Sequence, residues 1–315
     1  MGKNALIIGG GFAGCAMSHQ FLLHKENWNI TIVEKSGDIG AGVKTHWYGS
    51  HPYTFGPRHF LTKDESLYEY IQSVIPMRRL DHVFLSYIES DNEFYNFPMH
   101  IDDVKRMPDY EKIKDELDSL SDEKFSASNI EEYWLSSVGA TLYEKFAKHY
   151  NKKMWFVDPK ELDMGVPDWA SKGALLHTGK KEAFHDWVTA FPDTPNGYDD
   201  YFVKATKGAN VLLNTEIEEY DLPKKRVKIR GEWKQYDVIV NTISLDRAFE
   251  NCYGTLPFIG LDFYPIVLPV KQLLPDNIFF LYYSGKEKHK RIVEYKKFFK
   301  NENPYTLIGF EVPSL

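Results

Sequence analysis

A cluster of glycines near the start of the chain has the spacing of a phosphate-binding turn. The pattern G-x-G-x-x-G begins at Gly9, after an apolar run at 5–8 and before a helical pattern at 15–23. Glycines at this spacing permit a tight turn and let a pyrophosphate approach the N-terminus of the helix, where backbone N–H groups point outward. The sequence therefore predicts a dinucleotide-binding site, with a turn that serves only packing as the alternative. Its cofactor-binding residues are Gly9, Gly11, Phe12, Ala13 and Gly14.

A β-branched strand at 30–33 ends in Glu34, and an acidic residue at this distance from the glycine turn binds a ribose hydroxyl. The pair Glu34-Lys35 is followed by a second glycine turn at 39–42. A second close approach of the backbone is typical of FAD proteins, whereas NAD dehydrogenases have no need of it. We therefore predict FAD as the cofactor and add four residues to its site: Glu34, Lys35, Gly40 and Gly42.

The composition argues against several other classes of protein. The 315 residues carry a net charge of −7, which disfavours general nucleic-acid binding because phosphate affinity depends on the number of cations presented. Cys15 and Cys252 are the two cysteines, and neither has the spacing of a metal ligand, so we expect no disulfide and no metal site. No window contains roughly 18 uncharged apolar residues, and no signal peptide is visible. We therefore expect a cytoplasmic protein that does not bind membranes.

The order of the expected elements indicates an α/β fold with four parts. Residues 1–100 form the first part of the nucleotide-binding domain, and residues 101–165 form a helical insertion, because apolar residues there recur about once per helical turn. Residues 166–260 contain a substrate loop and a strand at 238–242 that returns to the nucleotide-binding sheet. Residues 261–315 contain several strand-like runs, which suit a mixed sheet over a substrate cleft.

Two hairpins and one loop are expected outside the glycine turns. Strand-like runs at 83–88 and 93–97 flank a polar turn, and a second hairpin at 216–231 overlaps the basic stretch 223–234. We interpret these lysines and arginines as a solvated hairpin edge, since edge strands favour them. Residues 47–62, rich in aromatic and histidine side chains, are expected to form a loop.

The segment 129–155, NIEEYWLSSVGATLYEKFAKHYNKKMW, resembles the UDP-galactopyranose mutase family. In that family a helix with a similar Glu-Glu, Ser-x-Val-Gly and Leu-Tyr pattern leads to Tyr-x-x-Lys-x-Trp. The glycine turn, the loop at 55–57 and the segment 291–296 add further matches, so the similarity runs from about residue 4 to residue 310. The resemblance implies a FAD-binding Rossmann-like domain of the GR2 type, with a helical insertion and a mixed β-sheet substrate region.

The same resemblance implies a mutase that interconverts the pyranose and furanose forms of a nucleotide sugar of the UDP-galactose type. In the family, N5 of reduced FAD attacks the anomeric carbon and UDP departs, without net redox change. Trp155 matches the residue that lines the uridine and sugar region, Tyr150 a tyrosine that contacts the diphosphate, and Arg291 the arginine that holds it. These three are our candidate catalytic and substrate-binding residues, although each can also be interpreted as an ordinary core or strand residue.

The flavin side of the site departs from the family pattern. The family has a histidine directly after Gly-Pro or Gly-Ala, whereas here Arg58 follows Pro57 and His59 comes one residue later. We assign all three to cofactor binding, with a contact to the flavin that is either cationic or shifted along the loop. His82 stands where the family commonly has an asparagine near the nucleotide sugar, and is a substrate-binding candidate.

Two further departures leave other functions open. The family's second diphosphate-binding arginine would fall at Trp169, and no arginine occurs at 156–225, so we expect Lys172, Lys180 or Lys181 to replace it. The family also ends in a segment that covers the flavin, which this sequence lacks. Either FAD is bound more loosely, or a homodimer or a partner chain supplies the segment, or this product is truncated. The alternatives are a flavin-dependent oxidoreductase for a different substrate and a non-catalytic, half-site nucleotide-binding subunit.

Overall fold

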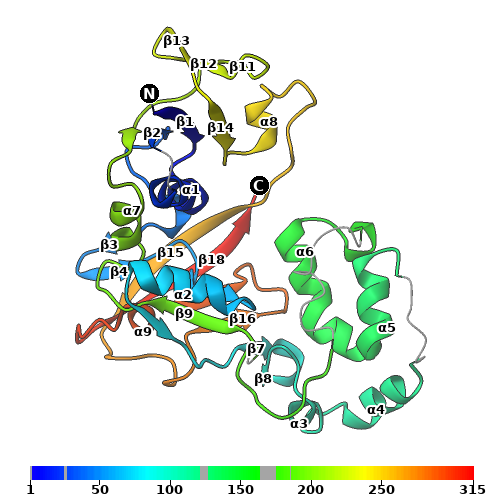
Figure 1. Cartoon of the computed structure of the whole chain (residues 1–315). Coiled ribbons are helices and arrows are strands. Elements are labelled where there is room, and N and C mark those ends of the chain that lie inside the picture. The colour runs from blue at the N-terminus through cyan, green and yellow to red at the C-terminus, as the bar shows by residue number, and fades with distance from the viewer. Residues whose placement is uncertain (1, 25–26, 121–126, 164–174, 185) are drawn as a thin grey trace.

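The structure is a computed structural model that describes residues 2–24, 27–120, 127–163, 175–184 and 186–315. Three groups of elements make up the molecule in Figure 1: a parallel sheet with its helices near the N-terminus, a mixed sheet through the middle, and a group of helices to one side. The pocket described below lies between the mixed sheet and this group of helices.

A four-stranded parallel sheet forms the part that contains both glycine turns. In order across the sheet, the strands are β10 (Asn210–Leu212), β2 (Trp28–Val33), β1 (Lys3–Ile8) and β14 (Val238–Asn241). Residues 5–8 are buried, as expected for a central parallel strand covered on both faces, and this explains the unbroken apolar run in the sequence. Helix α1 (Phe12–Leu23) follows β1 directly. The strand expected at 238–242 does return to this sheet, beside β1.

In the described part of the segment expected to be helical there are four α-helices. They are α3 (Ile101–Val104), α4 (Tyr110–Asp118), α5 (Ile130–Tyr143) and α6 (His149–Trp155), with a π-helical turn between the last two. Helix α5 begins where the side chain of Asn129 accepts a hydrogen bond from the N–H of Glu132, which caps the first turn. The helices bury a core of their own, to which Trp134 and Val138 contribute before a break in α5 at Gly139 (φ +82°), and Leu142 after it.

A six-stranded mixed sheet carries one wall of the pocket. In order, its strands are β15 (Gly260–Leu268), β18 (Thr306–Ser314), β17 (Arg291–Glu294), β16 (Phe280–Tyr283), β7 (Leu85–Ile88) and β8 (Glu93–Asn96). The expected hairpin at 83–97 is confirmed as β7 and β8, and Ile88 and Tyr95 reach from it into the helical core. Strands β17 and β18 pair with Arg291 opposite Glu311, so these two side chains share one face of the sheet.

Shorter elements connect the three groups. The small strands are β3 (His46–Tyr48), β4 (His51–Tyr53), β5 (Phe60–Thr62), β6 (Met77–Arg79), β9 (Val188–Pro192), β11 (Glu219–Asp221), β12 (Arg226–Ile229) and β13 (Glu232–Gln235). The remaining helices are α2 (Glu65–Val74), α7 (Asp199–Ala205), α8 (Leu245–Ala248) and α9 (Lys296–Phe299). Across the described residues, none of the helices has both the length and the apolar character needed to cross a membrane.

Of two finer expectations, one was confirmed and one was wrong. The hairpin expected at 216–231 is present as β11 and β12, and a second reversal at Arg230 and Gly231, both with positive φ, adds β13 to make a three-stranded meander. The segment 47–62 is not a continuous loop, because β3 and β4 pair with each other and β5 pairs with β9.

Candidate functional site

The first glycine turn needs glycine at two positions for the fold itself. Gly9 has φ of +103°, and a Cβ there would lie 2.5 Å from Oγ1 of Thr242. A Cβ on Gly14 would lie 2.0 Å from the carbonyl oxygen of Gly9, so α1 packs directly against the end of β1. Gly11 differs, because the nearest atom to its Cβ would be Cβ of Ala41, at 3.6 Å. The space beside Gly11 is therefore open to a ligand.

The N-terminus of α1 faces the same open space with its backbone amides. Its N-cap residue is Gly11, no side chain caps it, and no acidic residue stands in its first turn. The ring of Phe12 stacks on Tyr201, with centroids 5.0 Å apart, so this side chain points into the core. The N–H groups at the start of a helix that lacks a side-chain cap are suited to a pyrophosphate.

Glu34 stands at the carboxyl end of β2, beside the first turn. Its Oε2 accepts a hydrogen bond from the N–H of Gly10 (2.7 Å), and Oε1 accepts from the N–H of Ser36 (2.8 Å). Burial raises its pKa, but the hydrogen bonds from Ser36 and Gly10 outweigh this and lower the pKa overall. Glu34 is thus an ionised acceptor, as a ribose hydroxyl requires. Lys35 is exposed and lies 3.6 Å from Glu216.

The second glycine turn packs against the first and reaches toward the pocket. Gly40 has φ of +103°, and its N–H donates to the carbonyl oxygen of Gly10 at 2.8 Å. A Cβ on Gly42 would lie 3.3 Å from Nη2 of Arg58, which also lines the pocket. Arg58 therefore spans the distance between the dinucleotide turns and the pocket.

The pocket is a cavity of about 270 Å³, and three of the segments that line it contain predicted site residues. One wall is a face of the last helical turns, where residues three and four apart lie together: Ala147, Tyr150, Asn151, Met154 and Trp155. The mixed sheet contributes Tyr282, Lys290 and Arg291, and the loop at 55–59 closes the side nearest the glycine turns. The structure thus brings together six predicted site residues: Pro57, Arg58, His59, Tyr150, Trp155 and Arg291.

Positive charge dominates the sheet side of the pocket. Arg291 donates from Nη2 (2.6 Å) and Nε (3.1 Å) to Oε2 of Glu311, whose side chain is fully buried. Nζ of Lys290 lies 3.6 Å from the same oxygen, and Arg58 is close enough to lower the pKa of Lys290 further. The three cations Arg58, Lys290 and Arg291 and the one carboxylate of Glu311 leave an excess of positive charge here, and we call these three cations the cationic wall. Such a wall is suited to an anion with two charged phosphates.

Tyr150 faces the cations from the helical wall as a neutral phenol. Burial raises its pKa, and its ring packs edge-on against Tyr282 with centroids 5.9 Å apart. Asn151 is 4% exposed and also lines the pocket. Helical spacing from Ala147 and Trp155 could have predicted Asn151 from the sequence.

The two histidines of the predicted site differ in their relation to the pocket. His59 lines the pocket, and its Nδ1 lies 3.0 Å from the carbonyl oxygen of Pro57. His82 is 1% exposed and packs against Phe84, with ring centroids 4.6 Å apart, and it is not among the residues that line the pocket. Burial, and then the neighbouring His59, lower the pKa of His82 to about 3. A neutral imidazole among aromatic rings favours a packing role for His82.

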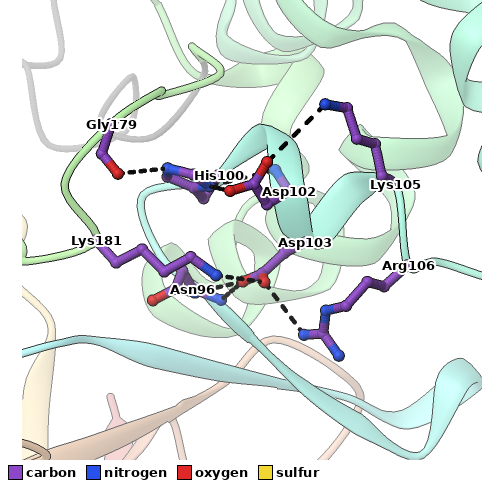
Figure 2. A network of polar contacts seen from close by, with 8 residues as sticks. All are labelled: Asn96, His100, Asp102, Asp103, Lys105, Arg106, Gly179 and Lys181. Carbon is purple, nitrogen blue, oxygen red and sulfur yellow. Dashed lines mark hydrogen bonds and ion pairs between the residues drawn. The ribbon is translucent and has the colours of Figure 1, made fainter.

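Of the lysines expected to replace the family's second arginine, the two that the structure describes, Lys180 and Lys181, do not line the pocket. Lys181 lies 3.2 Å from Oδ1 of the buried Asp103, which also accepts from the N–H of Asn96 (2.7 Å) and from Arg106 (3.1 Å). Figure 2 shows Lys181 and Arg106 converging on Asp103. Lys180 is exposed. Trp169 and Lys172 lie outside the described residues.

Asp103 connects the segment at 177–181 to the helical part through its ion pair with Lys181, and we call this its fastening role. Neutralisation of Asp103 should therefore destabilise the protein. For Asp103→Asn we expect a loss of about 2 kcal/mol in the free energy of unfolding at pH 7, because two charged partners lose their acceptor. Burial opposes ionisation, but hydrogen bonds from Asn96, Lys181 and Arg106 lower the pKa of Asp103 overall. Urea titrations at several pH values measure the effect.

The sign of the pH dependence follows from that lowered pKa. The stabilisation by Asp103 is complete above the unfolded-state pKa of about 3.9 and is lost as the pH falls through the lower folded-state value. The difference between wild type and Asp103→Asn should therefore shrink in acid. Asp102→Asn is the matched control, because the Asp102 side chain is 62% exposed and its loss should cost less than about 0.5 kcal/mol. Equal effects of the two substitutions would contradict the fastening role.

The strand, glycine turn and helix define a Rossmann-like dinucleotide-binding protein, and residues 7–74 match the family model described as an NAD(P)-binding Rossmann-like domain. Residues 145–315, more than half of the chain, match the model described as UDP-galactopyranose mutase. The chain therefore belongs to the UDP-galactopyranose mutase family, and the resemblance seen in the sequence is confirmed.

Individual relatives are distant. A Klebsiella pneumoniae protein named as a probable UDP-galactopyranose mutase is 22% identical over 276 residues, which cover 83% of this chain and 65% of that protein. The dTDP-fucopyranose mutase of Escherichia coli is 24% identical over 279 residues, with coverage of 83% and 68%. The chain thus spans about two thirds of the length of these relatives. A reduced UDP-galactopyranose mutase has the same fold, with a TM-score of 0.81 at 14% identity over 99% of this chain and 75% of that one.

Proposed function

We propose that this chain binds FAD at the two glycine turns and a nucleotide sugar in the pocket, and that it interconverts the pyranose and furanose forms of that sugar. The observation that carries the proposal is the position of the cationic wall: Arg58 lies beside Gly42 of the second turn and also lines the pocket with Arg291. A cofactor at the turns and a diphosphate at the wall would thus be neighbours. Reduced FAD, when bound, would supply a nucleophilic nitrogen for the anomeric carbon.

The residues of the chain would then position the sugar and stabilise the departing diphosphate. The guanidinium of Arg291 is held in place by Glu311 and remains exposed to the pocket, so it can meet the negative charge that develops on the phosphates. Tyr150 faces it as a hydroxyl donor, and Trp155 offers a flat apolar surface at the opposite end of the helical wall. Phe97, Phe146 and Met154 keep much of the remaining lining apolar, which limits access of water to the reacting carbon.

UDP-galactose is the first substrate to test, because the matched family and one relative are named for it. The second relative is named for dTDP-fucopyranose, so the corresponding dTDP sugar is the second. Both place a nucleoside diphosphate at the cationic wall, and both fit the proposal.

The test begins with the cofactor. We expect the purified protein, after addition of FAD and removal of the unbound excess, to retain the visible absorption of a flavin at near one equivalent. The dithionite-reduced protein should then convert UDP-galactofuranose to UDP-galactopyranose, whereas the oxidised protein should not. Oxygen consumption or net hydride transfer with a substrate would favour a flavin-dependent oxidoreductase, and failure to retain flavin would contradict the proposal for this chain.

A further inference from the structure

Lys290 lines the pocket but has no assigned role in the function proposed above. Its side chain is 12% exposed and precedes β17, next to Arg291. Its Nζ lies 3.6 Å from Oε2 of Glu311, which is longer than a hydrogen bond. The ammonium group therefore keeps donors that a bound molecule in the cavity can use.

The carboxylate beside Lys290 is already engaged by another cation. Oε2 of Glu311 accepts both hydrogen bonds of Arg291, at 2.6 and 3.1 Å. One buried negative charge thus faces two nearly buried positive charges, with Arg58 as a third cation nearby. A desolvated lysine without its own counter-ion is costly, and an anionic ligand would offset this cost.

We propose that Lys290 supplies the second cation for the diphosphate of the nucleotide sugar, beside Arg291. This inference rests on the function proposed above and assigns to Lys290 the part that the sequence assigned to lysines at 172–181. The two cations differ in how each can bind a phosphate. Arg291 has a fixed orientation because Glu311 holds its planar fork, whereas Lys290 is a point charge whose flexible stem can follow the second phosphate.

The groups around Lys290 make diphosphate binding depend on pH. Burial, followed by the positive charges of Arg291 and Arg58, lowers the pKa of Lys290 to about 8, while Glu311 opposes this. Tyr150 and Tyr282 also border the cavity, and their raised pKa values keep them neutral in this range. His289 has a lowered pKa and is neutral above pH 7. A terminal phosphate has its second pKa near 6, so the charge of the ligand is constant above pH 7.5. Diphosphate affinity should therefore fall as the pH rises through about 8.

The test compares three ligands and four proteins by isothermal titration calorimetry at pH 7.5 and 9.5. The ligands are UDP, UMP and inorganic pyrophosphate, and the proteins are wild type, Lys290→Met, Lys290→Arg and Lys288→Met. We expect Lys290→Met to weaken the binding of UDP and of pyrophosphate by about 10- to 100-fold at pH 7.5. The binding of UMP should be weakened much less, since UMP lacks the second phosphate. Lys290→Arg should bind UDP with a Kd within a few-fold of that of wild type at pH 7.5, and its affinity should not fall at pH 9.5. Lys288 is exposed and does not line this pocket, so Lys288→Met should match wild type.

The outcomes separate this inference from the function on which it rests. If wild type binds UDP and Lys290→Met binds it equally well, or if Lys290→Arg keeps the pH dependence, Lys290 is not the second cation and the mutase proposal stands. If wild type prefers neither UDP nor pyrophosphate over UMP, the diphosphate site itself is refuted. Circular dichroism and urea titration of Lys290→Met exclude unfolding as the cause, because replacing a desolvated ammonium with a similar-sized apolar chain should not destabilise the protein.

Discussion

Replacement of Arg291 by glutamine lowers kcat/KM for UDP-galactofuranose by about 10²- to 10³-fold, which is the expected cost of losing one donor that meets developing charge. The substitution removes the bidentate fork that would hold the departing diphosphate. The measurement is the initial rate with dithionite-reduced, FAD-loaded protein at several substrate concentrations. Equal falls in kcat and kcat/KM would place the interaction in the transition state, whereas a rise in KM with kcat unchanged would place it in uniform substrate binding.

Arg291→Gln alone also leaves Glu311 buried without its main partner, which should destabilise the protein by about 3–5 kcal/mol. The double variant Arg291→Gln with Glu311→Gln removes both charges, so we expect it to recover most of the stability but none of the activity. Urea unfolding of the three proteins distinguishes the two effects. A double variant with kcat/KM within tenfold of wild type would show that Arg291 has no role in the reaction.

Alanine at Gly14 and alanine at Gly11 should have opposite consequences. At Gly14 the added Cβ would lie 2.0 Å from the carbonyl oxygen of Gly9, a backbone atom that cannot move without separating α1 from β1. We expect Gly14→Ala to lose about 3 kcal/mol or more of unfolding free energy, or to fail to fold. At Gly11 the backbone has φ of −72° and the Cβ would meet only Ala41 at 3.6 Å, so Gly11→Ala should fold normally.

Gly11→Ala should nevertheless weaken FAD binding by about 100-fold, because its methyl group would occupy the side from which the pyrophosphate approaches the turn. Fluorescence titration with FAD and urea unfolding of the same preparations measure the two properties. Gly49→Ala is the control for a glycine substitution elsewhere, because no neighbour would lie within 4 Å of the added Cβ. Unlike Gly11, Gly49 has a positive φ of +61°, so this variant should lose some stability but keep its FAD affinity. Normal FAD affinity in Gly11→Ala would mean that the pyrophosphate does not approach this turn.

Much of this protein could be predicted from short stretches of its sequence. The run at 5–8, the glycines after it and the strand ending in Glu34 form a parallel strand–turn–helix unit because every interaction that defines the unit is local or joins neighbouring strands. The helices between 101 and 155 follow from apolar residues at helical spacing, and the face that carries Tyr150 and Trp155 follows from the same periodicity. The match of Arg291 to the family was likewise a matter of local residue order.

The composition of the cationic wall was decided by the tertiary structure. Arg291 and Glu311 are twenty positions apart, and only the register of β17 with β18 makes them partners, with Lys290 drawn to the same carboxylate. Lys181 has the residue type expected of the second cation, but Asp103 lies 78 positions away in sequence and engages it through a contact that no spacing rule anticipates. Charged side chains pair with whatever the fold brings within a few ångströms. The sequence alone therefore determined the two glycine turns, whereas the packing of strands and helices decided which cations face the pocket.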